Sequence, residues 1–491
     1  MLLSELLHNL EYKSRAPLED INVKKVTSRI DEISKDTLFV WVRGVNYDTS
    51  KLYNEIIKRA PAVIVCEDDI EAECTVIKVE NARKALSHLL STLYKIDYQK
   101  TKFIGVTGTN GKTTTATIIY EILKQTGHKV GFIGTGVIKY LDEAFTDKTY
   151  SMTTPDPEVL YKSIRRMQRA GCEVIVMEVS SHAIALNKIS PIPFKYSIFT
   201  NLSDEHLDFH KNMEDYFYTK LKLFKQTENG IFNADDEYSA RAMREAFDLC
   251  NTTSVGIIWE AETAARDVIL NGFDGSSYIY RDGLRIFKVN LSLVGYHNIY
   301  NSLLALRCVI DFGVPAYRAK EILKEIKSVC GRFEITKDDV CVIIDYAHTP
   351  EAFENVLRTV NLLKKPWQNI TTVFGCGGDR DRGKRPKMAE IAEKNSSYVI
   401  VTEDNSRCES ASRIFSDIMS GFSDTTKRKL ISSRTEAITH AILEALPDDI
   451  ILILGKGHER YFIDSTGYHD YDERAVISAA IRKRKETVRY K

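Results

Sequence analysis

The stretch "GVTGTNGKTTT", residues 105–115, decides the fold of the middle of the chain. The apolar run "TKFI" precedes it, and "ATIIYEILKQTG", which has helical spacing, follows it. A strand, a glycine-rich turn and a helix in this order can bind a polyphosphate, because the backbone N–H groups of the turn and the positive end of the helix face it. Lys112 would then reach the β- and γ-phosphates, and the Thr113 hydroxyl would bind Mg²⁺. The usual pattern has a glycine where this chain has Val106, so the loop is a variant, and a glycine turn without a ligand is the alternative.

The composition indicates an ordinary globular protein of several domains. The chain has 491 residues, which is too long for one hydrophobic core and predicts two to four domains. Its 68 basic and 68 acidic residues balance, so net charge favours neither nucleic acid nor a membrane surface as a partner. We expect no signal peptide and no membrane span. Nine cysteines without a C-x-x-C pair predict reduced thiols in a cytoplasmic protein.

Short apolar runs that end in polar residues recur along the chain and predict an α/β fold. Near the N-terminus, residues 36–42 and 61–67 are predicted strands, 50–60 is the helix between them, and 81–96 is an amphipathic helix. Strands are then predicted in "KFIGVTG", "CEVIVMEVSSH", "YSIFTNL" and "NGIFNADD". Residues 250–290 are predicted to form a hairpin or meander, followed by a helix in "NIYNSLLALRCVIDFG".

A third unit is predicted to open near "CGRFEI" and to repeat this pattern. Its strands are expected in "VCVIIDYAHTP", "ITTVFGCGGDRDR", "YVIVTEDNSR" and "DIILILGKGHER". Parallel sheets with crossover helices have this rhythm, and they bind ligands at the carboxyl ends of their strands. The glycine- and arginine-rich turn at 375–385 is therefore expected to bind phosphate or carboxylate through a bidentate guanidinium; a solvated turn is the alternative.

Two strand ends in the middle of the chain carry groups that suit a metal–nucleotide site. Glu178 ends "VIVMEVSSH", about where an acid on a second strand would meet Mg²⁺. Another strand ends with Asp204, His206, Asp208 and His210. A single histidine here is either a metal or phosphate ligand or a hydrogen-bonded structural residue, and both readings stay open for His206.

Taken in order, the motifs of the whole chain resemble those of the Mur ligases, ATP-dependent amide-forming enzymes that build the peptide stem of cell-wall precursors. "GTNGKTT" (108–114) is similar to their variant phosphate loop. "EVSSHAI", "TNLSDEHLDFH", "GYHNIYNSLLAL", "GRFE" and "DYAHTPEA" follow in the family's order. "TTPDP" (153–157), "GGDRDRGKRP", the D-N-x-R stretch at 404–407 and "GKGHE" look most like the MurE type, which adds the third stem residue to UDP-N-acetylmuramoyl-L-alanyl-D-glutamate.

The resemblance implies an α/β protein of three domains. These are a UDP-precursor-binding domain (1–97), a central ATPase domain with a doubly wound P-loop sheet (98–329) and a C-terminal Rossmann-like amino-acid-binding domain (330–491). It also implies ATP and Mg²⁺ as cofactors, the UDP-muramoyl-dipeptide and a free diamino acid as partners, and a cytoplasmic monomer. In the implied chemistry, the D-glutamate carboxylate attacks the γ-phosphate of ATP, and the incoming amine then attacks the acyl phosphate.

The resemblance also assigns roles to single residues. It implies that Lys112, Lys220, His206 and Glu178 are catalytic, and that Thr113, Glu178, His206 and a carbamylated Lys220 bind the metal. It implies nucleotide contacts from Gly108, Thr109, Asn110, Gly111, Lys112, Thr113, Thr114, Asn298, Asn301, Arg332 and Asp345. The implied substrate contacts are Ser28, Thr153, Thr154, Ser180, Lys188, His348, Arg380, Asp404, Asn405, Arg407, Gly455 and Glu459. From the residues alone, Lys220 is predicted to be a solvated helix lysine, as Lys222 and Lys225 are.

Arg407 favours meso-diaminopimelate as the incoming amino acid, because the distal carboxylate of that molecule needs a cation. Two departures from the family pattern keep other acceptors open: Ser406 stands in place of proline and frees the loop's φ, and "YDTSK" (47–51) replaces a D-G-H stretch. Lys188 stands in place of arginine, which keeps the charge but loses the bidentate geometry. The alternatives are a ligase for L-lysine or another diamino acid, an archaeal pseudomurein ligase and, less similar, a folylpolyglutamate synthetase. An alternative of another class is a nucleotide-binding module without ligase chemistry.

Overall fold

The computed structural model describes residues 1–14, 17–43, 52–146, 152–207 and 209–489. The expected "YDTSK" substitution at 47–51 and Asp208 lie outside these residues. The chain forms two compact units. The first holds Met1–Phe145, Met152–Thr263 and Leu304–Val314, and the second holds mainly Ala264–Leu303 and Pro315–Lys491. The division of the chain into three domains, with boundaries at residues 97 and 329, stays a prediction.

The first unit begins with a small sheet in the order β1-β5-β4-β3-β2. Its strands are β1 (Lys13–Ser14), β2 (Lys25–Thr27), β3 (Thr37–Val40), β4 (Val63–Cys66) and β5 (Thr75–Lys78), and its helices are α1 (Leu3–Leu6), α2 (Tyr53–Lys58) and α3 (Ala82–Leu93). Apolar side chains such as Phe39, Ile56 and Ile64 form its core. The strands expected at 36–42 and 61–67 and the helix expected at 81–96 are confirmed; β5 was not predicted, since its residues alternate only weakly in polarity.

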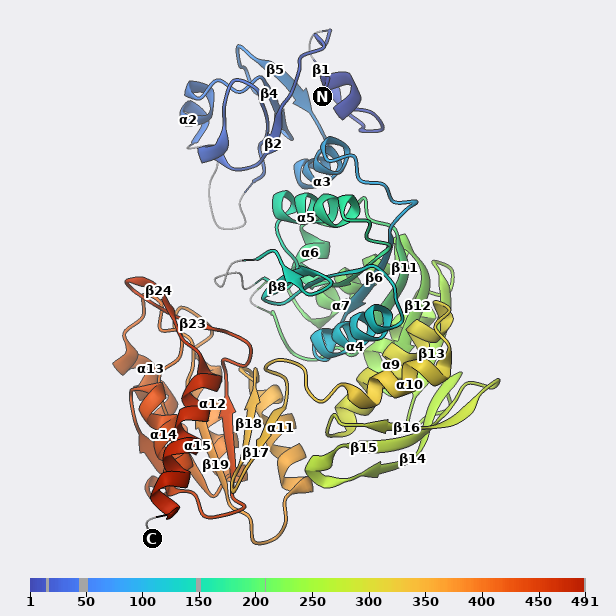
Figure 1. The fold of residues 1–491 in the computed structure, drawn as a ribbon. Coiled ribbons are helices and arrows are strands. Elements are labelled where there is room, and N and C mark those ends of the chain that lie inside the picture. Colours follow the sequence, from blue (N-terminus) through green and yellow to red (C-terminus); the bar gives the residue numbers. More distant parts are fainter. Residues whose placement is uncertain (15–16, 44–51, 147–151, 208, 490–491) are drawn as a thin grey trace. The chain divides into compact units, whose positions relative to one another are not determined.

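The second sheet of this unit carries the phosphate loop (Figure 1). Its strands are β6 (Lys102–Thr107), β7 (Val130–Gly134), β8 (Val137–Tyr140), β9 (Glu143–Ala144), β10 (Val174–Glu178), β11 (Phe194–Phe199), β12 (Thr227–Asn233) and β13 (Asn251–Gly256). They lie in the order β13-β12-β11-β6-β10-β7-β8-β9. The helices are α4 (Lys112–Gln125), α5 (Pro157–Arg169), α6 (Ser181–Ala185), α7 (Met213–Leu221) and α8 (Glu237–Glu245). The strands from β13 to β7 are parallel, as expected from their buried apolar runs.

The order of these strands fixes the place of the candidate site. β6 lies between β10 and β11, although the chain runs from β6 to β7 first. The point where strand order reverses in this way is where open α/β sheets bind ligands. Register places Glu178 of β10 opposite Val106 of β6, and Phe199 of β11 opposite Thr107. The residues that follow β6, β10 and β11 therefore meet at one edge of the sheet.

The second unit starts with an antiparallel meander of β14 (Thr263–Leu270), β15 (Ser276–Arg281) and β16 (Ile286–Leu291), which confirms the expected hairpin region. Next come α9 (Tyr296–Asp311), whose residues from Leu304 on belong to the first unit, and α10 (Ala316–Glu325). A six-stranded sheet in the order β17-β18-β22-β19-β20-β21 follows; β17 is antiparallel and the rest are parallel. Its strands are β17 (Glu334–Lys337), β18 (Cys341–Asp345), β19 (Ile370–Phe374), β20 (Tyr398–Val401), β21 (Arg428–Leu430) and β22 (Ile450–Leu454).

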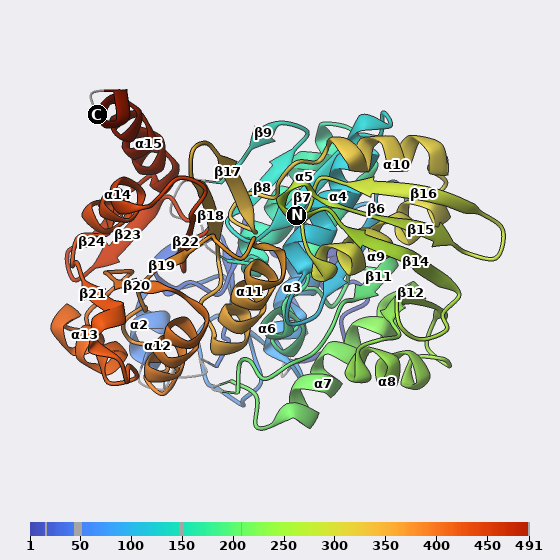
Figure 2. The ribbon, with the colours of Figure 1, turned by 90° about the horizontal axis from the view of Figure 1, so that it is seen from below.

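Helices cover both faces of this sheet (Figure 2). Alternate residues of β22 point to opposite faces, as the pleat requires: Leu452 packs with α11 (Pro350–Leu363), α12 (Lys384–Asn395) and α13 (Ala411–Met419). Ile451 packs on the other side with α14 (Arg434–Glu444) and α15 (Glu473–Arg489). A hairpin of β23 (Tyr461–Asp464) and β24 (Gly467–Asp470) completes the unit. The predicted Rossmann-like pattern is thus confirmed. None of the described helices combines the length and apolar character needed to cross a bilayer.

Candidate functional site

The loop between β6 and α4 is held in a shape that only glycine permits at two positions. Gly108 has φ +141° and Gly111 has φ +83°, both in the region that disfavours side chains. A Cβ at position 108 would lie 1.9 Å from Thr200 Oγ1, so the loop packs directly against the end of β11. Asn201 accepts the Thr109 N–H with its backbone oxygen (2.9 Å) and the Asn110 N–H with Oδ1 (2.8 Å). The loop is therefore preformed.

Lys112, the first residue of α4, lies over this loop. Its Nζ donates to the carbonyl oxygens of Gly108 (3.0 Å) and Thr109 (2.6 Å). The next two residues, Thr113 and Thr114, belong to the first turn of the helix, and Thr114 is buried. The amine is held where the loop and the helix N-terminus converge, which is the arrangement expected for a polyphosphate-binding lysine.

Glu178 and Thr113 supply oxygen atoms at the same place. The Glu178 side chain is fully buried, and its Oε2 accepts from the Thr113 hydroxyl (2.8 Å). Thr135 donates its backbone N–H to Oε1 (2.8 Å) and its hydroxyl to Oε2 (3.1 Å), so the carboxylate is hydrogen-bonded throughout. A hydroxyl and a carboxylate are hard oxygen donors of the kind that Mg²⁺ takes together with substrate phosphates. Among the described residues, no group of three or more His, Cys, Asp or Glu side chains could hold a metal by itself.

The environment of Lys220 differs most from the one predicted from the sequence. Its side chain is 1% exposed, whereas Lys222 and Lys225 are exposed. Its Nζ donates to the Gly108 carbonyl oxygen (2.9 Å), the same atom that Lys112 contacts, and lies 4.6 Å from the centre of the Tyr216 ring. Burial and then the Lys112 cation lower the pKa of the Lys220 amine well below its ordinary value. The expectation of a solvated lysine is wrong.

The two histidines of the β11 strand end differ in their surroundings. His210 is buried; its Nε2 is 2.9 Å from Ser181 Oγ, and its Nδ1 is 3.6 Å from an Asp215 oxygen. It is a structural histidine. His206 is 40% exposed, has φ +58°, and lies 3.8 Å from Glu205, with its ring centre 6.2 Å from that of Tyr216. A ligand role for His206, and the four-residue metal set, stay predictions.

The residues expected to contact the UDP-precursor have structural partners in the first unit. Ser28 donates its N–H (3.0 Å) and its hydroxyl (2.8 Å) to Glu158 Oε1. The Thr154 hydroxyl donates to the Glu178 carbonyl oxygen and accepts the Ser180 N–H, which links the ends of two loops. The other three have partners as well: Ser180 Oγ caps α6, Thr153 Oγ1 lies 3.1 Å from Thr135 Oγ1, and Lys188 pairs with Asp156 at 2.7 Å.

The second unit holds the remaining residues expected to bind nucleotide. Asn301 Nδ2 donates to Asn298 Oδ1 (3.1 Å), and both asparagines are buried on α9. The Asp345 carboxylate accepts two backbone N–H groups, from Phe333 and Ala347. Burial raises the pKa of Asp345, and the Arg332 cation opposes this. Two further contacts belong to this region: the Arg332 guanidinium lies 4.7 Å from the Tyr346 ring centre, and Lys384 donates to the His348 carbonyl oxygen.

The strand ends of β20 and β22 meet in a cluster of charged groups. Asn405 is 4% exposed; its Oδ1 accepts from Lys456 Nζ (2.9 Å) and from the Ile463 N–H (3.1 Å), and its Nδ2 donates to Glu459 (2.8 Å). Lys456 Nζ also lies 3.4 Å from an Asp404 oxygen. Burial opposes ionisation of Asp404, but the Lys456 and Arg434 cations outweigh it and keep the pKa of that carboxyl below its usual value.

Glu459 and Gly455 belong to the same cluster. Burial and the adjacent Asp404 carboxylate raise the pKa of Glu459. Gly455 has φ +113°, and a Cβ there would lie 2.8 Å from Asp404 Oδ2, so glycine is needed for the strand end to reach the carboxylate. The structure thus brings Asp404, Asn405, Gly455 and Glu459 together, as expected, around a lysine that sequence reasoning did not select.

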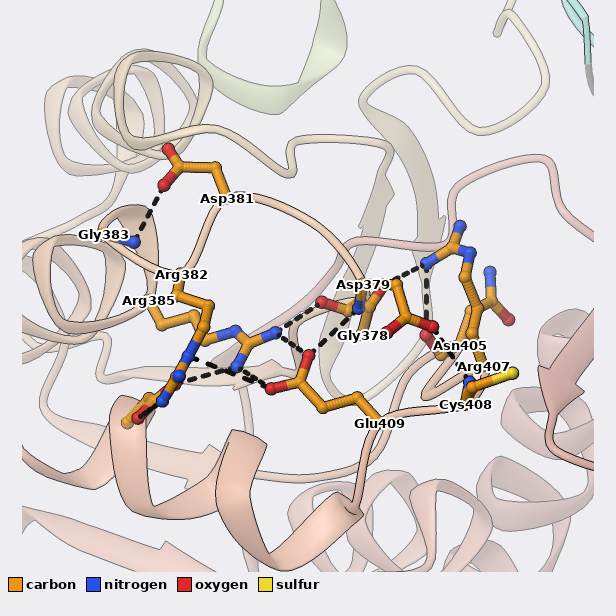
Figure 3. Close-up of polar contacts among 12 residues, drawn as sticks. Gly378, Asp379, Asp381, Arg382, Gly383, Arg385, Asn405, Arg407, Cys408 and Glu409 are labelled. Carbon is orange, nitrogen blue, oxygen red and sulfur yellow. Dashed lines mark hydrogen bonds and ion pairs between the residues drawn. The ribbon is translucent and has the colours of Figure 1, made fainter. Parts of the chain in front are cut away.

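Arg407 lies beside this cluster, on a loop that crosses the β19–α12 loop (Figure 3). Its Nη1 donates to the carbonyl oxygens of Gly378 (2.9 Å) and Asn405 (3.3 Å), while the outer nitrogen of the guanidinium points away from them. Although Ser406 replaces proline, the loop is not loose: the Ser406 carbonyl oxygen accepts the Glu409 N–H, and the Gly378 N–H donates to the Asn405 carbonyl oxygen. The expected relaxation at Ser406 is not seen.

The arginines of the 375–385 turn divide into two kinds. Arg382 and Arg385 bind internal carboxylates, with Arg382 on Asp417 and Arg385 on Glu409 and Asp417. The interpretation of this turn as a bidentate ligand site is wrong for these two residues, because their guanidinium groups are engaged inside the unit. Arg380 is exposed and stays the candidate from this turn.

Sequence reasoning missed Thr135, Asn201, Lys456, Arg385 and Glu409. Thr135 lies on a loop without a recognisable motif, whereas Asn201 is inside the quoted "TNLSDEHLDFH" and was passed over for its charged residues. Lys456 is inside the quoted "GKGHE", and its position at a strand end was the available signal.

Comparisons with known proteins show the family to which the chain is similar. The model of the Mur ligase middle domain matches residues 106–309, and that of the Mur ligase glutamate ligase domain matches residues 331–457. A UDP-N-acetylmuramoyl-L-alanyl-D-glutamate–2,6-diaminopimelate ligase from Bacillus cereus is 36% identical over 95% of this chain and 96% of its own length. The ligase of the same name from Clostridioides difficile is 37% identical over 98% of this chain and all of its own length. A solved structure of a protein with this name, at 24% identity, has a TM-score of 0.71 and covers 99% of both chains, which supports the fold.

Proposed function

The chain belongs to the Mur ligase family, and on that premise we propose that it joins meso-2,6-diaminopimelate to UDP-N-acetylmuramoyl-L-alanyl-D-glutamate at the expense of ATP. The observation that carries the acceptor assignment is Arg407, held by two carbonyl oxygens beside the Asp404–Glu459 cluster. The names of relatives that are 36% and 37% identical over nearly the whole chain support it. The product is a precursor of peptidoglycan, made in the cytoplasm by a monomer.

The proposed reaction needs the D-glutamate carboxylate to gain a leaving group. Its oxygen attacks the γ-phosphorus of ATP, the bond to the β-phosphate oxygen breaks, and ADP leaves. The amine of diaminopimelate then attacks the acyl carbon, phosphate leaves, and the amine proton passes to solvent. In such transfers the protein contributes chiefly position and charge neutralisation. Lys112 supplies the cation, and the N–H groups at the start of α4 (112–114) supply donors to the phosphates, since those of Thr109 and Asn110 are bonded to Asn201.

Mg²⁺ fits the pair of oxygen donors on Thr113 and Glu178. The metal would neutralise phosphate charge when bound. Thr135 holds the Glu178 carboxylate in place by two hydrogen bonds, so its free lone pairs keep one direction. His206 would add a ligand from the β11 strand end.

We assign carbamylation to Lys220 because two amines share one carbonyl oxygen. Lys112 and Lys220 both donate to the Gly108 oxygen, at 3.0 and 2.9 Å, so two full positive charges there would repel each other strongly. The neutral Lys220 amine attacks carbon dioxide, a nitrogen–carbon bond forms, and one proton leaves to solvent. The resulting carbamate is an anion beside Lys112 and a metal ligand, which removes the repulsion.

The remaining assignments follow the family order. Ser28, Thr153, Thr154, Ser180 and Lys188 bind the UDP-precursor; Asn298, Asn301, Arg332 and Asp345 bind the nucleotide, and His348 binds substrate. Arg380, Asp404, Asn405, Arg407, Gly455 and Glu459 bind the incoming amino acid. The domain boundaries proposed are 1–97, 98–329 and 330–491.

The proposal is tested by phosphate release from the purified protein. We expect release from ATP only when the UDP-dipeptide and diaminopimelate are both present, with the tripeptide product seen by mass spectrometry. Release that needs neither substrate, or no release with any amino acid of a panel, would favour the nucleotide-binding module. Release with L-lysine in place of diaminopimelate would support the lysine-adding alternative instead.

Replacing Arg407 with alanine is expected to lower kcat/KM for diaminopimelate about a hundredfold and to narrow the preference over L-lysine. A hundredfold loss is typical when one partner of a charge-assisted hydrogen-bonded pair is removed from a closed site, because the distal carboxylate is then left without a cation. L-Lysine lacks that carboxylate and places an ammonium beside Arg407 instead. Initial rates with both amino acids measure the change, and Arg413→Ala, an exposed arginine on α13, is the matched control. A variant that keeps the wild-type preference would show that Arg407 does not read the distal carboxylate.

A further inference from the structure

A polar cluster of the second unit lies beside the Arg407 loop (Figure 3). Its centre is Arg385 on α12, whose side chain is completely buried. Its Nη1 and Nη2 donate to the two oxygens of Glu409 (2.8 and 2.6 Å), Nη1 also reaches Asp417 (2.8 Å), and Nη2 reaches the Gly377 carbonyl oxygen (3.1 Å). A buried cation costs much to desolvate unless it is paired in this way.

Glu409 carries the effect of Arg385 to the neighbouring loop. Its Oε2 accepts the Asp379 N–H (3.0 Å) as well as the Arg385 donor. Asp379 Oδ2 in turn accepts the N–H of Cys408 (3.0 Å), the residue after Arg407. The Arg385 guanidinium holds the pKa of Glu409 to about 2, so Glu409 is ionised at any working pH. The β19–α12 loop thus supplies an acceptor for the loop that carries Arg407, and Glu409 next to that loop supplies an acceptor for the β19–α12 loop.

The backbone between these contacts is in a conformation that needs support. Asp379 and Arg407 both have φ +52°, in the left-handed region that is strained for a non-glycine residue. At Gly378, a Cβ would lie 1.9 Å from the Ser406 carbonyl oxygen, so the two loops cross at backbone distance. Strained residues persist only where their surroundings fix them. At this crossing Glu409 accepts the Asp379 N–H, and Arg385 holds Glu409 in place.

We propose that the Arg385–Glu409 pair is a positioning device for acceptor choice, which holds the crossed loops so that the outer nitrogens of Arg407 face the distal carboxylate of the incoming amino acid. This rests on the proposed function. Neither residue touches the acceptor: Arg385 is buried beneath the loop, and Glu409 faces Arg385 and the Asp379 N–H. The pair therefore acts through Arg407 and not on the reacting atoms.

Glu409→Ala and Glu409→Gln separate the contacts of this carboxylate. Alanine removes both the partner of Arg385 and the acceptor of the Asp379 N–H. Glutamine keeps a neutral oxygen for that N–H. Loss of a charge-assisted hydrogen bond network of this kind is expected to lower kcat/KM for diaminopimelate about tenfold or more in Glu409→Ala, mainly through KM. Glu409→Gln should recover a large part of this loss.

The ratio of kcat/KM for diaminopimelate to kcat/KM for L-lysine distinguishes a positioning role from a purely structural one. A loss of stability alone would leave this ratio unchanged. We expect this ratio to fall about tenfold in Glu409→Ala, with KM for ATP and for the UDP-dipeptide within about twofold of wild type. Arg413→Met is the matched control: it removes an exposed arginine from α13, outside the Arg385–Glu409 contacts, and it should leave the ratio unchanged.

Three results would contradict either the positioning role or the acceptor assignment, and they can be told apart. If Arg407→Ala collapses the ratio and Glu409→Ala leaves it intact, the positioning role is wrong and the ligase assignment stands. If Glu409→Ala raises all three KM values and lowers the melting temperature, with the ratio unchanged, the pair serves stability alone and the proposal is overturned. If the wild type shows no preference for diaminopimelate, the acceptor assignment itself fails.

Discussion

Lys112→Ala loses turnover by about a thousandfold or more while the protein stays folded. The amine of Lys112 is the cation that the β6–α4 loop holds against the helix N-terminus, through the oxygens of Gly108 and Thr109. Removal of one preorganised charge at a transferring phosphoryl group typically costs two to three orders of magnitude or more, since the remaining groups do not replace the charge that is lost. The fold is spared because Lys112 lies at the start of α4 and is not part of the apolar core.

Three measurements check this expectation: the steady-state rate, ATP affinity by calorimetry and the melting temperature. Lys124→Ala is the control, because it removes the same side chain from the other end of the same helix, where the lysine pairs with Asp142 at the surface. We expect weaker ATP binding only in Lys112→Ala, and an unchanged melting temperature in both. Activity near the wild-type level in Lys112→Ala would remove the nucleotide-site assignment.

Lys220→Ala is expected to be nearly inactive and to be rescued in part by acetate. The carbamate proposed on Lys220 is an anion in a fully buried position, and alanine leaves both a space and a missing negative charge there. A small carboxylate can enter that space and replace the metal-binding oxygens. The fold should tolerate the change, because the site then no longer buries an amine whose pKa is strongly lowered.

The test of Lys220 compares three lysines of one segment. Lys222→Ala and Lys225→Ala remove exposed amines a few residues on, and both should retain wild-type rates. Carbon-13 NMR of the wild type in labelled bicarbonate should show a carbamate signal that Lys220→Ala lacks. Full activity of Lys220→Ala without acetate, or the same signal in the variant, would contradict carbamylation.

The sequence predicted the fold and the phosphate loop because these depend on local patterns. Buried parallel strands read as apolar runs, and the loop is recognised from its glycines and Lys112. Glu178 was found for the same reason, since it ends a strand whose place in the sheet follows from the pattern. The residues that were missed depend on which face of a helix or loop is buried. Lys220 and Lys222 are alike in sequence, and only the packing of α7 separates them.

The acceptor loops show a second limit of sequence reasoning. The motif identified Arg407, but Ser406 appeared to loosen the loop, and the arginines of the 375–385 turn appeared to face a ligand. Hydrogen bonds between residues some 30 positions apart decide both points, as in the contacts of Asp379 with Glu409 and Cys408. No local spacing encodes such pairs.

The place of β6 between two later strands has a consequence for synthesis on the ribosome. The loop after β6 needs Thr200 and Asn201 for its shape, and Lys220 for its charge balance, so about a hundred further residues must leave the ribosome before it is complete. At translation rates of about 5–20 residues per second, that wait lasts roughly 5–20 s. Until β10 and β11 have been made, β6 lacks both of its neighbouring strands, and ATP cannot stabilise the unfinished chain. Chaperones that cover exposed strands are thus of most use to this protein while residues 108–220 are being made.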